Sequence, residues 1–378
     1  MIAPRARDIG IPFPGMPGLH NAITDVPGVT VGHTTLIEGD GPLVVGKGPI
    51  RTGVTTILPR GKTYDPVFAG TAVLNGNGEM TGTQWIEESG FLDTPIAITN
   101  THSVGVVRDA MLGWMVEHRL YDPPPSGAVW LLPVVAETYD GVLNDINGFH
   151  VRPEHVIAAL ESAASGLVAE GGVGGGTGMT CHGFKGGIGT SSRKVEDGGF
   201  TLGVLVQANH GARRDLTLAG VAVGQHITGS EREIHSLMVT EGTGSIIVII
   251  ATDAPLLPHQ LKRLARRATI GIGRLGAYGA NSSGDLFLAF STANPGAARR
   301  SGNVPLEMLP NDQLDPFFRA SVEATEEAIA NALIAGRTMT GINGNTVYDL
   351  PHDQVREIMG RFGRLDEAEH LYSDKEDS

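Results

Sequence analysis

Short apolar segments rich in β-branched residues recur along the whole chain and alternate with glycine-containing or polar turns. Apolar segments bounded by Gly, Pro or Asn are typical of β-strands. Five of them predict strands, at residues 53–58, 129–135, 202–206, 245–251 and 285–291. The longest uninterrupted apolar run, 246–251, is far too short to cross a bilayer.

Helical spacing is clearest near the C-terminus, where Asp315 and Pro316 suit the start of a helix and Gly336 suits its end. Between them, apolar residues recur every three to four positions, which predicts a helix. A second helix is expected from Pro258, with a basic face that is either solvated or a subunit contact. Shorter helices are predicted at 103–118, 154–164 and 353–361.

Strands and helices are mixed along the whole length, without a Pro/Ser-rich linker or a repeat of fixed period. We therefore expect a single α+β domain over residues 1–378, with two sheets packed face to face and helices outside. A doubly wound parallel sheet is the alternative. The acidic tail, 366–378, is not expected to pack.

Composition and charge narrow the function classes. Apolar residues make up 41% of the chain, which is ample for a large core, and the net charge of −13 disfavours nucleic-acid binding. The first residues lack the apolar region of a secretory signal, and the only cysteine, Cys181, excludes an intrachain disulfide. The chain is predicted to be a soluble, cytoplasmic protein that does not bind membranes.

Two motifs that invite a cofactor or metal interpretation do not fit it. The glycine-rich stretch 171–178 lacks the Lys-Ser/Thr of a phosphate loop and the strand-to-helix setting of a dinucleotide site, so a packing role is favoured. The histidines show no zinc-hydrolase spacing, and Cys181 beside His182 is more simply a small buried residue. We expect neither a metal nor a cofactor.

The dipeptide Gly244-Ser245 stands immediately before the apolar run 246–251. If the serine hydroxyl cut its own peptide bond, Ser245 would carry both a nucleophilic oxygen and a free amine, and such an amine can activate the hydroxyl. An ordinary loop before a strand is the simpler interpretation of these residues alone.

Polar side chains follow apolar strands at several other places. Ser283 and Asp285 are two residues apart, so in an extended segment they face the same way and could hydrogen-bond a nucleophile. Glu137 could hold a substrate ammonium, and Asn209 could stabilise an oxyanion. Each could instead belong to an ordinary turn, but convergent strand ends are common sites of binding and catalysis.

The chain resembles the DmpA/BapA-type aminopeptidases, also called L-aminopeptidase/D-esterases, and most of all their DmpA members. The resemblance runs nearly end to end, through the segments 21–26 (NAITDV), 51–55 (RTGVT), 75–82 (NGNGEMTG), 99–105 (TNTHSVG), 183–193 (GFKGGIGTSSR) and 242–245 (GTGS). It implies a four-layer α-β-β-α sandwich similar to N-terminal-nucleophile hydrolases, with the strand topology shared by ornithine acetyltransferases. It also implies self-cleavage between Gly244 and Ser245 into chains 1–244 and 245–378.

The resemblance also implies a role for each candidate residue. Ser245 matches the nucleophile, and Ser283 and Asp285 match the pair that orients and activates it. The remaining matches are Asn209 for the oxyanion-stabilising amide, Glu137 for the carboxylate that receives the substrate amine, and Tyr139 for a tyrosine at the reacting centre.

The function expected from these residues is that of a self-processing serine aminopeptidase without a metal or cofactor. Its expected substrates are small peptides, aminoacyl amides or esters with a free N-terminal amine, and the family suggests a homo-oligomer. Two alternatives remain open at this stage: an acyltransferase of the same fold, and a non-catalytic binding or assembly protein.

Overall fold

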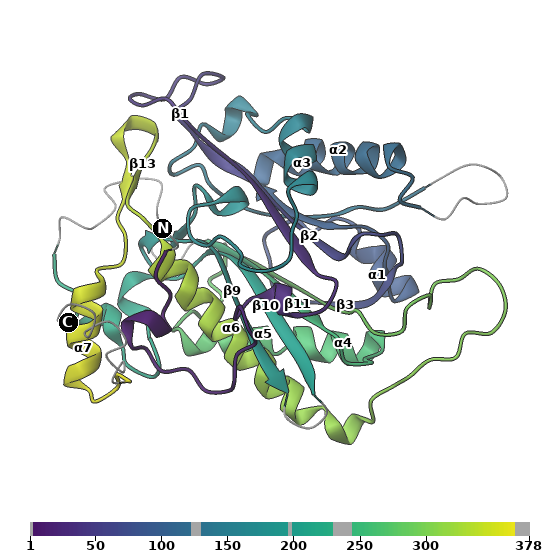
Figure 1. The fold of residues 1–378 in the computed structure, drawn as a ribbon. Helices are drawn as coiled ribbons and strands as arrows, with labels where there is room; N and C mark the ends of the chain where they lie inside the picture. Colours follow the sequence, from purple (N-terminus) through teal and green to yellow (C-terminus); the bar gives the residue numbers. More distant parts are fainter. Residues whose placement is uncertain (1–2, 122–129, 196–198, 230–243, 367–378) are drawn as a thin grey trace, which may run out of the picture.

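Two β-sheets pack face to face and are covered by helices on their outer sides (Figure 1). The structure, a computed structural model, describes residues 3–121, 130–195, 199–229 and 244–366. The four-layer α+β sandwich expected from the resemblance is confirmed, and the alternative of a doubly wound parallel sheet is wrong.

The larger sheet has six strands and carries the candidate serine. Its strands lie in the order β4 (Phe91–Leu92), β3 (Val67–Gly76), β12 (Gly284–Ser291), β11 (Ser245–Thr252), β10 (Phe200–Asn209) and β9 (Gly187–Val195). Only β11 and β12 are parallel within this sheet.

The smaller sheet has four strands, in the order β1 (Thr30–Glu38), β2 (Ile50–Lys62), β5 (Ile96–Asn100) and β6 (Val134–Thr138), of which β5 and β6 are parallel. Two short hairpins complete the β-structure: β7 (Thr180–Cys181) with β8 (Phe184–Lys185), and β13 (Met339–Thr340) with β14 (Thr346–Val347).

Helices cover both outer faces. The smaller sheet packs against α2 (Val104–Glu117) and α3 (Pro153–Glu161), which lie above it in Figure 1. The larger sheet packs against α4 (Pro258–Ala265), α5 (Ala268–Arg274) and the long α6 (Asp315–Ala335). Two further helices, α1 (Thr83–Ser89) and α7 (His352–Arg361), lie at the ends of the molecule.

Strand β11 explains why its sequence is apolar without interruption. Its even-numbered residues, such as Ile246 and Val248, belong to the core between the larger sheet and its helices. Its odd-numbered residues, such as Ile247 and Ile249, belong to the core between the two sheets. A strand buried on both faces needs apolar residues at every position, so this strand is fixed in the centre of the molecule.

Several sequence predictions can be compared with these elements. The strand predicted at 129–135 begins only at Val134, because Pro133 has no N–H for a sheet hydrogen bond and Trp130 is 61% exposed. The glycine-rich stretch 171–178 packs tightly: a Cβ on Gly175 would lie 2.5 Å from the carbonyl oxygen of Ile98. The basic helix face is not simply solvated, since Arg267 lies over the ring of Phe318, 3.7 Å from its centroid. Apart from Asp366, the acidic tail lies outside the described residues.

Candidate active site

Ser245 is the first residue of β11 and lies between the two neighbouring strands. It is paired with Asn209 of β10 and with Gly284 of β12. Its Oγ accepts a hydrogen bond from the backbone N–H of Gly284, with an N···O distance of 3.1 Å. The residue is only 6% exposed, so its hydroxyl is held in a fixed position at the end of a rigid strand.

Gly244 has a backbone that only glycine accepts easily. Its φ is +142°, in the region that L side chains rarely adopt. A Cβ at this position would lie 2.0 Å from the carbonyl oxygen of Asn209. The preceding residues of the motif, Glu241 to Thr243, lie outside the described residues. The chain therefore reaches Ser245 through a constrained backbone pressed against the end of β10.

Ser283 and Asp285 lie together, as their spacing predicts. The Ser283 hydroxyl donates to Asp285 Oδ1 at 2.6 Å. Burial raises the pKa of Asp285, while the bonds from Ser283 and from the backbone N–H of Ile246 partly oppose the rise. Neither side chain hydrogen-bonds the Ser245 hydroxyl. Asp285 is instead paired with Ile246, the residue that follows the serine, and the backbone N–H of that residue bonds its carboxylate.

Asn209 is held by two hydrogen bonds that fix the orientation of its amide. Its Oδ1 accepts from the backbone N–H of Thr180 at 2.8 Å, and its Nδ2 donates to the carbonyl of Tyr139 at 3.0 Å. Because Asn209 and Ser245 are directly opposite in an antiparallel pair, their side chains emerge on the same face. One amide hydrogen of Nδ2 remains for an oxyanion beside the serine.

Glu137 is a buried carboxylate at the end of β6, with 4% exposure. Its oxygens accept hydrogen bonds from the backbone N–H of Glu79, at 3.0 Å, and from the Thr101 hydroxyl. Burial raises its pKa, and these two bonds partly oppose the rise. Among the described residues, no Lys or Arg forms a salt bridge with it. Such a carboxylate is suited to receive a cation from outside.

The segment at Gly78 connects this carboxylate to the serine. A Cβ built on Gly78 would lie 3.3 Å from Glu137 Oε1 and 3.2 Å from the Cα of Gly284. Gly284 is the residue whose N–H bonds Ser245. The ends of the two sheets thus come close together at this glycine.

Tyr139 contributes to this arrangement through its backbone. Its carbonyl accepts the bond from Asn209, whereas its phenol is 38% exposed and lies over Gly141. Burial and then Asp140 raise the pKa of the phenol. No hydrogen bond joins the phenol to Ser245 in the described structure, so its contact with the reacting centre stays a prediction.

Some residues of the site carry no sequence motif of their own. Gly284 acts through its backbone N–H, which bonds Ser245. Thr101 and Glu79 hydrogen-bond the Glu137 carboxylate, and Thr180 hydrogen-bonds the Asn209 amide. The only available indication for Gly284 was its place between Ser283 and Asp285. Sequence reasoning missed its role because nearly every residue type has a backbone N–H, so residue type does not show which one bonds the serine.

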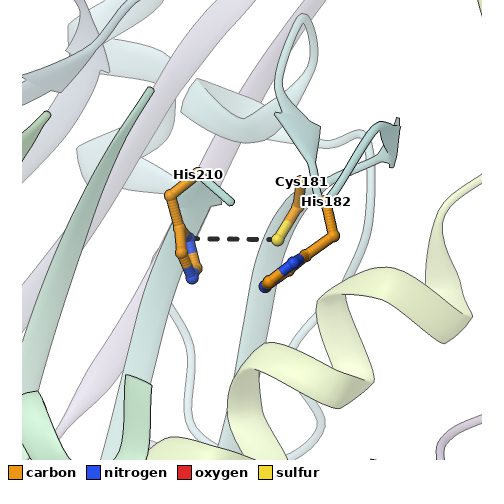
Figure 2. Close-up of side chains that lie close together, drawn as sticks. All are labelled: Cys181, His182 and His210. Carbon is orange, nitrogen blue, oxygen red and sulfur yellow. Dashed lines mark hydrogen bonds between the residues drawn. The ribbon is translucent and has the colours of Figure 1, made fainter. Parts of the chain in front are cut away.

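Cys181 lies just outside this site and is not a nucleophile. It is fully buried, and burial raises the pKa of its thiol to about 12. This confirms the simpler interpretation of a buried structural cysteine. Its neighbours are His182 and His210, and one potential ligand atom from each of the three residues lies within 4.8 Å of the others (Figure 2).

Comparison with known proteins identifies the family. The sequence profile of peptidase family S58 matches residues 21–347. The chain belongs to peptidase family S58. It is 56% identical to the beta-peptidyl aminopeptidase BapA of Sphingosinicella microcystinivorans, over 96% of this chain and 93% of that protein. A second BapA, from Sphingosinicella xenopeptidilytica, is 50% identical with the same coverage.

Solved structures agree with this family assignment. The L-aminopeptidase D-Ala-esterase/amidase of Ochrobactrum anthropi superposes with a TM-score of 0.89 at 50% identity, covering 96% of this chain and all of that one. It is described as a variant of the Ntn hydrolase fold. A Burkholderia beta-aminopeptidase superposes with a TM-score of 0.84 at 49% identity, over 95% and 99% of the two chains. These identities do not separate the DmpA branch from the BapA branch.

The S58 chain is thus a serine aminopeptidase, a hydrolase of the Ntn fold. The hydrolase interpretation is supported over the acyltransferase and over the non-catalytic protein. Within the described parts of the chain, none of the helices combines the length and the apolar character that crossing a membrane requires.

Proposed function

We propose that this peptidase cleaves its own chain between Gly244 and Ser245, and that Ser245 then releases N-terminal residues from peptides, amides and esters. The observation that carries the proposal is the position of Ser245. A buried serine begins a central strand, follows a glycine with φ of +142°, and has a backbone N–H donor on its Oγ.

Self-cleavage follows from this local geometry. Ser245 Oγ attacks the carbonyl carbon of Gly244, the C–N bond breaks, and the hydroxyl proton ends on the departing nitrogen. Water then hydrolyses the resulting ester, which releases the Gly244 carboxylate and regenerates the hydroxyl. The constrained backbone at Gly244 assists because strain at a reactive site typically stores about 1–3 kcal/mol.

The new amine becomes the base for the next reaction. An α-amine has an ordinary pKa of about 7.7–8.0, close to the value that suits a base near neutral pH. Ser283 and Asp285 flank Gly284, the strand partner of Ser245, and bond each other, and we assign them the orientation of this amine. Ser245 Oγ attacks the substrate carbonyl, the amine passes the proton to the leaving group, and water resolves the acyl-enzyme.

Asn209 is assigned to the oxyanion. Its amide is already oriented by Thr180 and Tyr139, so little rearrangement is needed when charge develops. Loss of one oxyanion donor costs roughly 10²–10³ in kcat in a comparable serine hydrolase, about 2.7–4 kcal/mol.

Glu137 makes the enzyme an aminopeptidase. A buried carboxylate without a partner cation is paired by the substrate ammonium, and substrates with blocked amines are rejected. The names of the curated relatives extend the proposed substrates to peptides with N-terminal β-amino acids.

Mass spectrometry of Ser245→Ala tests the proposal. The variant is expected to remain one uncut chain and to hydrolyse no aminoacyl p-nitroanilide, whereas the wild-type protein yields two chains of 244 and 134 residues, the latter being 245–378. Ser282→Ala is a suitable control because it changes a serine on the segment before β12 that has no proposed role. Cleavage at the same bond in Ser245→Ala would refute the mechanism.

A further inference from the structure

His210 lies beside the proposed cleavage junction, yet the mechanism above gives it no role. It directly follows Asn209 at the end of β10. A Cβ on Gly244 would lie 2.9 Å from the Cα of His210. The imidazole is buried in the space between β10 and the β7–β8 hairpin (Figure 2).

The contact of His210 with Cys181 is compatible with hydrogen on Nε2. Nδ1 faces the Cys181 sulfur at 3.9 Å (Figure 2). The thiol is protonated because burial raises its pKa to about 12, so it has a hydrogen to donate to an unprotonated Nδ1. Burial, followed by the neighbouring His182, holds the pKa of His210 well below 6.5, so the ring is neutral. A neutral imidazole that accepts at Nδ1 carries its hydrogen on Nε2.

His210 Nε2 and Asp285 Oδ2 are among the buried side-chain atoms of the described residues that make no hydrogen bond to another protein group. The first is a donor in the tautomer with hydrogen on Nε2, and the second is an acceptor. Buried polar atoms of native proteins are nearly always paired with protein or with ordered water. Each of the two atoms therefore requires a partner.

Both residues line the same small cavity. Its volume is about 10 Å³, and Ser283, Gly211, Ala212 and the segment 277–280 contribute to its walls. That is close to the smallest space that holds one water molecule, which needs two to four polar partners. A single water could therefore bond both unpaired atoms.

We propose that His210 is a positioning residue for Asp285. Its Nε2–H donates to one water in this cavity, and that water donates to Asp285 Oδ2. With Ser283 donating to Oδ1, both carboxylate oxygens then have a hydrogen-bond donor. The inference rests on the proposed function, in which Asp285 orients the amine of mature Ser245.

The other ionisable groups around His210 do not replace this interaction. The His182 ring lies 5.3 Å away between centroids, and its Nδ1–H donates to the Ala212 carbonyl at 3.0 Å. The charge of Lys185 lowers the pKa of Cys181, and the charge of Asp215 raises the pKa of His182. Besides His210, the ionisable residues that line its cavity are Asp285 and Tyr278, and Tyr278 is 65% exposed.

The proposed water between His210 and Asp285 has a measurable consequence for the pH dependence of kcat. A hydrogen bond to the charged form of a carboxylate lowers its pKa. His210→Phe keeps the ring volume but removes the donor, so the pKa of Asp285 rises. In mature enzyme, the acid limb of the kcat profile should move up by about one pH unit. KM should change little, because Glu137 is untouched.

Rescue by a conservative variant separates positioning from packing. His210→Gln restores an N–H donor near the position of Nε2, and should return the acid limb close to the wild-type position. His182→Gln is the matched control: it changes the neighbouring buried imidazole and should leave the acid limb in place. If His210→Phe and wild type have the same acid limb, or if His210→Gln rescues nothing, the proposal is overturned.

Two measurements independent of activity complete the test. Long-range ¹⁵N NMR of the wild-type protein should show hydrogen on His210 Nε2, and the Nδ1–H tautomer would overturn the proposal. Elemental analysis should find no stoichiometric zinc; one equivalent that is lost in His210→Phe would mean that Cys181, His182 and His210 hold an ion instead.

Activity in Ser245→Ala would refute the proposed function itself, whereas inactive Ser245→Ala with an unshifted His210→Phe profile would refute only the role of His210.

Discussion

At Glu137 a single buried carboxylate determines which substrates the site accepts. Its two oxygens are satisfied by Glu79 and Thr101, but neither partner carries a positive charge. Burial raises its pKa, so the free carboxylate takes up a proton at higher pH than an ordinary glutamate. An arriving ammonium reverses this effect by favouring the charged form.

Replacing Glu137 by Gln is expected to raise KM for free-amine substrates at least tenfold, about 1.4 kcal/mol. In wild type, kcat/KM should fall as pH decreases through the raised pKa of Glu137, because the neutral acid no longer pairs with the ammonium. In Glu137→Gln, this fall of kcat/KM at acidic pH should be absent. Steady-state kinetics from pH 4 to 9 with an aminoacyl p-nitroanilide measure both effects.

Glu79→Gln is the matched control for this change. Glu79 is exposed and donates to Glu137 through its backbone N–H, and its charge is a lesser cause of the raised pKa of Glu137. Removal of its charge should therefore change KM much less than Glu137→Gln does. Equal KM values in Glu137→Gln and wild type would remove Glu137 from substrate binding.

Individual residues of the site were predictable to different degrees. Ser245, Ser283, Asp285, Asn209 and Glu137 all stand at the ends of apolar strands, where polar groups are conspicuous in the sequence. Ser283 and Asp285 lie close enough to bond each other, while their predicted hydrogen bond to the nucleophile stays a prediction. The pairing of Asp285 with Ile246 was not predictable, because it depends on the register of β11 against β12.

At the scale of elements, close contact between α6 and β9 fixes the outer layer of the larger sheet. A Cβ on Gly189 of β9 would lie only 1.9 Å from the carbonyl oxygen of Ala328 in α6. The helix backbone cannot move aside without disturbing the core beneath it, because Ala328 and its neighbours are fully buried.

Gly189→Ala is therefore expected to destabilise the protein by about 1–3 kcal/mol through overpacking. Gly273→Ala is the control, since Gly273 is an exposed position in α5 with no atom near its missing side chain. Alanine there should be neutral or stabilising by up to about 1 kcal/mol. Urea unfolding of both variants measures the difference, and equal stability would show that α6 can shift without cost.

Element prediction worked where one sequence pattern has one structural solution. The helix predicted from Asp315 to Gly336 is α6, and the apolar run at 245–251 is β11. The strand predicted at 129–135 was placed too early because apolar residues before Pro133 resemble a strand in sequence. Trp130 and Leu132 are exposed, Leu131 packs in the core, and the strand starts only at Val134.

At the scale of the whole molecule, a buried ion cluster ties the N-terminal segment to the larger sheet and α6. Glu327 of α6 binds Arg193 of β9 at 2.7 Å and Arg7 of the N-terminal segment at 2.8 Å. The side chains of Glu327 and Arg193 are almost fully buried. Despite the opposing effect of burial, these partners lower the pKa of Glu327.

Glu327→Gln is expected to cost about 3–5 kcal/mol at pH 7, because it leaves the buried Arg193 without its closest anion. A lowered pKa in the folded state means that this stability is present above the unfolded-state pKa and is lost as pH falls through the folded-state pKa. In Glu327→Gln, the loss of stability that comes from protonating Glu327 at acidic pH should be absent. Thermal unfolding of both proteins between pH 3 and 8 measures this difference.

The neighbouring pair supplies a control for the ion cluster. Glu326 binds Arg274, whose side chain is 44% exposed, and such pairs contribute about 0–1 kcal/mol. If Glu327→Gln lowers the free energy of unfolding no more than Glu326→Gln does, the N-terminal segment is not anchored by this cluster.

By itself, the amino-acid sequence determined that this protein has an α+β fold, where its main strands and helices run, and which polar residues follow the strands. Those properties depend on local periodicity and on residue type, which are visible in one dimension. Tertiary structure alone decided which strand ends meet, because strand order and register are set by contacts between distant segments. It brought Gly78 between Glu137 and Gly284, and it placed His210 and Asp285 around one cavity, since burial and distance arise only when the two sheets close on each other.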